Sequence, residues 1–125
     1  MISVVDDDVL VRNATENLLM SLGYGVITFA SAEEFLASGR AEDTSCVITD
    51  VQMPGLSGLD LQQCLVKDGH HLPIIFITAF PSEGVRKRAL EAGAIGFLGK
   101  PIDEEILIEC LDRALNRPAL RNSES

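Results

Sequence analysis

The stretch CVITDVQMPG, residues 46–55, joins an apolar run to a single carboxylate and then to a turn. Residues 46–49 have the composition of a strand that is buried on both faces, which is typical of a parallel sheet. Asp50 follows this strand directly, and Pro54-Gly55 marks a bend. Because a buried strand gains nothing from a charge at its end, the stretch indicates both the sheet type and the place of a functional group.

Short apolar runs alternate with segments of helical periodicity along the rest of the chain. The other predicted strands are residues 2–5, 24–29, 73–78 and 95–98. The apolar spacing predicts helices over 9–22, from Ser31, over 57–67, over 82–92 and from Asp103. Strands that are each followed by a helix need crossover connections. They therefore predict an α/β fold with an open, doubly wound parallel sheet and helices on both faces.

Length and charge limit the function. The chain has 125 residues, 46% of them hydrophobic, and a net charge of -9. Nucleic acid needs a basic face, so we expect no direct nucleic-acid binding by this domain. The basic run Arg86-Lys87-Arg88 is expected to be a solvated helix face. Helical periodicity is lost after Asn116, so residues 1–117 are predicted to form one domain and 118–125 a tail or the start of a linker.

The sequence also bears on the compartment. No apolar run reaches the roughly 20 residues of a membrane helix, and the first residues lack the positive charge of a signal peptide. We therefore expect a cytoplasmic protein without membrane contact. Three cysteines without CxxC spacing, at positions 46, 64 and 110, are expected to be buried, reduced thiols.

Polar residues follow four of the five predicted strands. They are Asp6 and Asp7, Asp50, Thr78 and Lys100. In a doubly wound sheet the ligand site lies at the carboxyl ends of the strands, so we expect these side chains to meet. The acids after the first strand could also serve only as a cap and first-turn charges of the following helix, and Asp8 is expected to do so.

Their chemistry favours phosphoryl transfer. Crowded carboxylates repel one another unless a cation neutralises them or one is protonated, and oxygen ligands suit Mg²⁺ or Mn²⁺. An aspartate beside such a metal can act as nucleophile and carry an acyl phosphate. The pattern therefore predicts Asp50 as phosphoryl acceptor, with Asp6, Asp7 and Asp50 at the metal. Lys100 would neutralise charge on the transferred group and Thr78 would donate a hydrogen bond.

Over residues 2–116 the chain resembles the receiver domain of bacterial two-component response regulators. The resemblance rests on VVDDD (4–8), ITDVQMPGLSGLDL (48–61), IIFITA (74–79) and GAIGFLGKP (93–101). It implies a flavodoxin-like (βα)5 fold with strand order 2-1-3-4-5. It also implies a phosphorylation-activated signalling switch rather than an enzyme that turns over an external substrate.

The resemblance assigns roles to single residues. Asp50 would accept its phosphoryl group from a sensor histidine kinase or a phosphotransfer protein. Asp7 would be the main Mg²⁺ ligand, and the backbone carbonyl of Gln52 would complete the protein ligands. Thr78 and Phe97 would be the switch residues, with Phe97 at a position where tyrosine is common.

Further implications concern the surroundings of the site. The Lys100-Pro101 bond is expected to be cis. Phe80, bulky and apolar, is expected to shield the acyl phosphate from water. A homodimer through the fourth helix, fifth strand and last helix is also implied.

Alternatives stay open at this stage. A phosphatase of the haloacid dehalogenase type has a second aspartate two residues after its nucleophile, where this chain has Gln52. A flavodoxin would need a Ser/Thr/Gly-rich loop after the first strand. The chain is also compatible with a receiver piece of a DNA-binding transcription factor of the FixJ/LuxR type, whose effector is absent from it. His70 and His71 are expected to lie in a solvated loop before Pro73.

Overall fold

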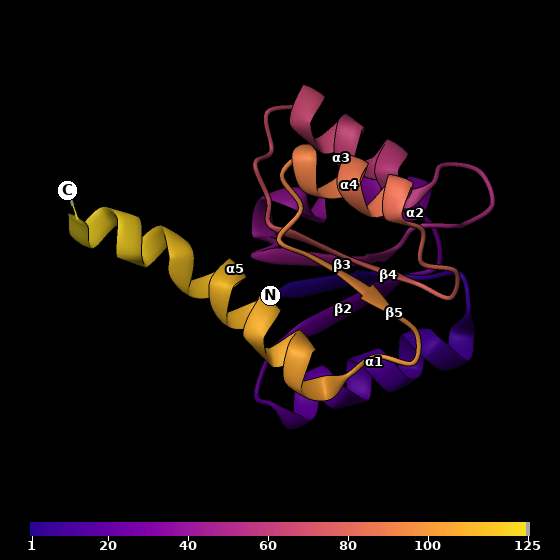
Figure 1. Ribbon diagram of the computed structural model, residues 1–125, viewed down its shortest axis with the longest axis horizontal. Coiled ribbons are helices and arrows are strands. Elements are labelled where there is room, and N and C mark those ends of the chain that lie inside the picture. Colours follow the sequence, from indigo (N-terminus) through magenta and orange to yellow (C-terminus); the bar gives the residue numbers. More distant parts are fainter. Residues whose placement is uncertain (125) are drawn as a thin grey trace.

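The fold is a five-stranded parallel sheet in the order β2-β1-β3-β4-β5 with helices on both faces, as predicted (Figure 1). This computed structural model describes residues 1–124, and side chains through Leu115. The strands are β1 (Ile2–Val5), β2 (Val26–Phe29), β3 (Cys46–Asp50), β4 (Ile74–Thr78) and β5 (Gly96–Gly99). The helices are α1 (Val9–Ser21), α2 (Ala32–Ser38), the 3₁₀ helix η1 (Arg40–Asp43), α3 (Gly58–Lys67), α4 (Glu83–Glu91) and α5 (Glu104–Glu124).

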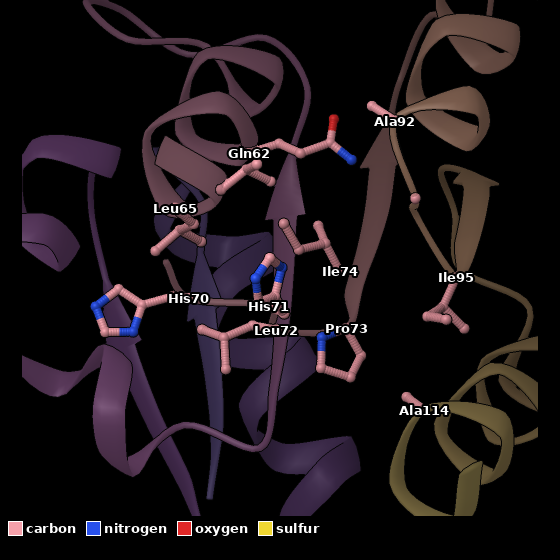
Figure 2. A pocket seen from close by; sticks show the side chains of 12 residues that line it. Gln62, Leu65, His70, His71, Leu72, Pro73, Ile74, Ala92, Ile95 and Ala114 are labelled. Carbon is pink, nitrogen blue, oxygen red and sulfur yellow. The ribbon is translucent and has the colours of Figure 1, made fainter. Parts of the chain in front are cut away.

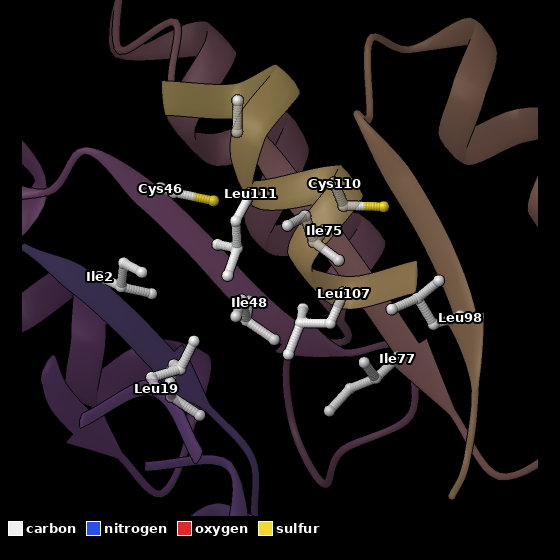
Figure 3. Packing of buried hydrophobic residues seen from close by; sticks show 12 residues of the cluster. Ile2, Leu19, Cys46, Ile48, Ile75, Ile77, Leu98, Leu107, Cys110 and Leu111 are labelled. Atoms are coloured by element: carbon white, nitrogen blue, oxygen red, sulfur yellow. The ribbon is translucent and has the colours of Figure 1, made fainter. Parts of the chain in front are cut away.

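Alternating strand residues divide the core into two layers. One layer, between the sheet and helices α1 and α5, contains Ile48 and Ile75 together with Leu19 and Leu107 (Figure 3). The other layer, on the opposite face, packs Val47 and Phe76 against helices α2, α3 and α4. Since both faces are covered, the central strands are mostly apolar and carry no charge except at their ends.

Side chains at the helix starts explain where the helices begin. Asp8 caps α1 by accepting from two backbone N–H groups, and Ser31 caps α2 by accepting from Glu34 N. Ser57 and Asp60 form a reciprocal capping box at α3. Asp8 therefore has the capping role that the sequence predicted for it. The side chains of Asp6 and Asp7 do not cap α1 and are available to the candidate functional site.

The cysteines are free thiols at different depths. Cys46 and Cys110 are buried, as predicted, but Cys64 is only half-buried. Burial, with the neighbouring Cys110, raises the pKa of Cys46 to about 12. Cys46 is therefore held as a neutral thiol and serves as a small core residue.

Two boundaries differ from the sequence prediction by more than one residue. β2 starts at Val26 instead of residue 24, because the Tyr24 N–H bonds the Leu19 carbonyl and so belongs to the end of α1. α5 continues to Glu124, past the predicted end of helical pattern, and its last turns project from the body (Figure 1). Apolar periodicity reports contact with the sheet, whereas backbone hydrogen bonds can extend a helix beyond that contact. The domain boundary at 117 stays a prediction.

Candidate functional site

Three carboxylates meet at the carboxyl edge of the sheet. Asp6 follows β1, Asp7 comes next, and Asp50 is the last residue of β3, the strand beside β1. One oxygen from each lies within 4.8 Å of the others. Asp6 and Asp50 are buried while Asp7 is exposed, so the cluster has a buried floor and one side open to solvent.

Lys100 brings positive charge to this cluster. Its Nζ lies 2.8 Å from Asp50 Oδ2 and 3.2 Å from Asp6 Oδ2. Burial by itself would lower the pKa of Lys100, but the hydrogen bond to Asp50 and the charges of Asp6 and Asp50 outweigh it, so the pKa is raised. Lys100 is therefore a fixed cation at physiological pH. The Lys100-Pro101 peptide is cis, in agreement with the expectation from the family.

Asp6 is the carboxylate whose buried oxygens lack a full set of hydrogen bonds. Its Oδ1 accepts from the Asp8 N–H at 2.9 Å. Its buried Oδ2 has the 3.2 Å ion pair with Lys100, whose shorter hydrogen bond goes to Asp50, and no other partner in the described part of the chain. Burial raises the pKa of Asp6, and the Asp8 N–H and the charge of Lys100 offset this only in part. A buried carboxylate oxygen without a full set of partners, beside two further carboxylates, fits a hard divalent cation such as Mg²⁺.

Backbone contacts fix the acidic residues. The Gln52 N–H donates to Asp50 Oδ1 at 3.0 Å, which closes the turn after β3. Arg12 Nη1 donates to the Asp6 backbone carbonyl at 2.7 Å from the second turn of α1. Arg12 was not predicted as a residue of the site, because an arginine on a predicted helix is usually solvated and no local pattern marks this one.

Thr78 lies at the end of β4, the strand next to β3, and Phe97 lies on β5, one strand further out. Thr78 ends β4 and is buried, and its Oγ1 accepts from the Phe80 N–H at 3.1 Å. Its carbonyl accepts from the Lys100 N–H at 2.8 Å, which ties β4 to the residue after β5. Phe97 is half-buried on β5, and its ring centroid lies 6.5 Å from that of Phe76. Phe80 has its side chain largely in solvent, at 72% exposure.

The two histidines lie at the opposite edge of the sheet. They line a cavity of about 270 Å³ near the start of β4, together with Gln62, Leu65 and other residues (Figure 2). His70 is half-buried and His71 is exposed, which agrees with a loop position before β4. Neither belongs to the acidic cluster, which lies where the strands end.

The profile of the response regulator receiver domain matches residues 2–112 of this chain. The chain belongs to the response regulator receiver family. Its general function is that of a phosphorylation-activated switch, and receivers generally bind Mg²⁺ and interact with histidine kinases or phosphotransfer proteins. Membership decides against the phosphatase and flavodoxin alternatives.

Known relatives agree with this membership. The receiver is 40% identical to nodulation protein W of Bradyrhizobium diazoefficiens, over 97% of this chain and 53% of that protein. It is 38% identical to the transcriptional regulatory protein FixJ of Azorhizobium caulinodans, over 94% and 56%. The chain thus spans about half the length of these relatives.

Solved structures have the same fold. The structure of response regulator StyR matches with a TM-score of 0.87 at 41% identity, over 98% of this chain and 62% of that one. The FixJ-N structure matches with a TM-score of 0.82 at 33% identity, over 92% of each chain. No helix within residues 1–124 of the receiver is both long and apolar enough to cross a membrane.

Proposed function

We propose that Asp50 is the phosphoryl acceptor of this receiver, with Asp6, Asp7, Asp50 and the Gln52 carbonyl as the ligands of Mg²⁺ or Mn²⁺. The observation that carries the proposal is the convergence of Lys100 on Asp50 and Asp6, with Asp7 inside the same cluster. A structural ion pair would need one carboxylate, whereas this site gathers three. When bound, a divalent cation supplies charge neutralisation on the phosphoryl oxygens.

The reaction at Asp50 is an in-line displacement. A carboxylate oxygen of Asp50 forms the new O–P bond while the N–P bond of a donor phosphohistidine breaks, and the imidazole leaves with the electron pair. Lys100, held protonated by its acidic neighbours, exchanges its contact with Asp50 for a contact with the phosphoryl oxygens. The turn after Asp50 keeps the carboxylate in place, because Oδ1 accepts from the Gln52 N–H.

Thr78 is suited to detect the new group. Its oxygen already accepts from the Phe80 N–H, so its own hydrogen is free to donate to a phosphoryl oxygen. A movement of Thr78 toward Asp50 would open space at the end of β4. Phe97, half-buried on the adjacent strand β5, would then turn further inward and change the surface of α4, β5 and α5.

The test is incubation with a small acyl-phosphate donor and Mg²⁺. We expect one added phosphate per chain, lost in Asp50→Asn, and no sustained release of phosphate from the donor beyond the slow decay of the phosphorylated protein. Labelling of Asp50→Asn to the wild-type level would refute the assignment of the acceptor. Turnover of many equivalents of donor would instead indicate a phosphatase.

We further propose the context of the domain. Its phosphoryl donor is a sensor histidine kinase or a phosphotransfer protein, and it works in the cytoplasm. Since the relatives include named transcriptional regulators of about twice its length, we propose that the receiver, residues 1–117, regulates a DNA-binding effector and does not itself bind DNA. Phosphorylation would favour a homodimer through α4, β5 and α5. Sedimentation with and without a phosphoryl mimic tests this, and an unchanged mass would contradict it.

A further inference from the structure

The loop after Asp50, residues 51–57, is held by a side chain from a different helix. The Leu56 N–H donates to Glu33 Oε2 at 3.2 Å, across 23 positions of sequence. Glu33 lies in the first turn of α2, and α2 and α3 cover the same face of the sheet (Figure 1). Although Glu33 is exposed, its carboxylate is therefore directed onto the backbone of the loop.

Gly55 shows how closely this carboxylate approaches. Its φ of +77° lies in the left-handed region, which favours glycine. A Cβ placed on Gly55 would also overlap the Glu33 carboxylate, with Cδ of Glu33 at 3.2 Å. The glycine therefore allows both the bend of the loop and the approach of Glu33.

The other polar ties of this loop lie at its two ends. At the start, the Val51 N–H bonds the Ile77 carbonyl of β4 at 3.0 Å and the Gln52 N–H bonds Asp50 Oδ1; at the end, the Gly58 N–H bonds the Val51 carbonyl at 2.9 Å. Between these ties, Pro54 has no N–H to donate, and Gly55 has the wide backbone freedom of a glycine. The buried side chains of Val51 and Met53 anchor the segment around Gln52, and the Glu33 contact adds a polar tie on the far side of the bend that limits how the Gln52 carbonyl, the proposed backbone ligand, can turn.

The neighbouring acid has a different contact. Glu34 Oε1 lies 3.4 Å from the Ala30 N–H, while the Glu34 N–H donates to Ser31 Oγ. Glu34 thus reaches back to the N–H of Ala30, the residue before the N-cap, instead of to the Ser31 N–H that a capping box would use. Two adjacent carboxylates of equal charge, one on the loop and one on its own helix, provide a matched pair for experiment.

We infer that Glu33 is a positioning residue of the metal site: it holds the loop that carries Gln52 and thereby sets the Mg²⁺ affinity of the unphosphorylated domain. The inference rests on the proposed function of the acidic cluster. Partners one contact removed from metal ligands commonly change metal affinity by about 10- to 100-fold when mutated. Because Glu33 acts through an exposed hydrogen bond, we expect a smaller effect, about three- to tenfold.

The experiment is a Mg²⁺ titration of the metal-free protein, followed by the amide NMR signals of residues 50–58, with amide hydrogen exchange of Leu56 as a second readout. Wild type is compared with Glu33→Ala, Glu33→Gln and Glu34→Ala. We expect Glu33→Ala to raise the Mg²⁺ Kd about three- to tenfold and to speed exchange of the Leu56 amide. Glu33→Gln keeps an oxygen acceptor, so its Kd should stay within about twofold of wild type, as should that of Glu34→Ala.

A Kd for Glu33→Ala within about twofold of wild type would overturn the inference. So would equal weakening in Glu33→Gln and Glu33→Ala, because the effect would then come from charge and not from the hydrogen bond. Failure of the proposed function would look different. The wild-type domain would then either not bind Mg²⁺ or bind it equally well after Asp7→Asn.

Discussion

Gly58→Ala is the substitution for which the structure predicts the clearest loss. A Cβ at Gly58 would overlap the backbone oxygen of Asp50, and it would lie 3.0 Å from the Phe76 ring and 3.1 Å from Val51 Cα. Two of these three obstacles are backbone atoms of β3 and its turn, and the third is a fully buried ring. None can move as the end of a flexible side chain would, so the backbone of Asp50 must shift.

The expected magnitude combines two opposing effects. Overpacking of a tightly packed site costs about 1–3 kcal/mol, while replacing a helical glycine by alanine contributes up to about 1 kcal/mol of stabilisation. We therefore expect a net destabilisation of about 1–2 kcal/mol. With a urea m-value of about 1.5 kcal/mol/M, the unfolding midpoint would fall by roughly 1 M. Phosphorylation of Asp50 should slow as well, because its carbonyl and carboxylate move together.

Gly84→Ala is the matched control. Gly84 also lies in the first turn of a helix, but the nearest atom to a Cβ there is Ser82 Oγ at 3.9 Å. Because alanine only improves helix propensity at this position, the urea unfolding midpoint should stay the same or rise, and the rate of Asp50 phosphorylation should be unchanged. Urea unfolding of both variants is the assay. A Gly58→Ala domain as stable as wild type would refute the argument that α3 needs this close approach to β3.

Three further predictions concern the charged cluster and its rim. Lys100→Met removes the cation that lies 2.8 Å from Asp50, so Mg²⁺ should bind more tightly. The shift of the Phe97 NMR signals on phosphorylation should be lost. Weaker Mg²⁺ binding would contradict this prediction. Burial raises the pKa of Asp6, so its charged form costs stability in the metal-free domain, and that cost grows as pH rises through the folded-state pKa. Asp6→Asn should therefore stabilise the metal-free domain against urea at pH 7 more than near pH 4, and an equal effect at both would refute this sign. Phe80→Ala should shorten the lifetime of the phosphoryl group by admitting water, and an equal or longer lifetime would show that this largely exposed ring does not shield it.

Much of the fold could be predicted because its determinants are local. Short continuous apolar runs, period-3.6 apolar patterns and capping residues act within a few positions, and they predicted five strands and the helices that follow them. The members of the acidic cluster could also be named, because parallel strands bring their carboxyl ends to one edge whatever the details of packing. Asp6, Asp50, Thr78 and Lys100 lie at that edge as expected.

Contacts between distant segments were decided only by the tertiary structure. Nothing local to Arg12 or Glu33 shows that one bonds the Asp6 carbonyl and the other the Leu56 amide. The sequence likewise predicted Lys100 as a site residue, but only the folded chain shows that it pairs with both Asp6 and Asp50. Within the described residues, Asp6 Oδ2 has no polar partner besides that ion pair. The physical reason is that hydrogen-bond geometry and desolvation depend on distances of a few tenths of an ångström across helices and strands. Patterns of residue type determine which elements form, and packing alone determines those distances.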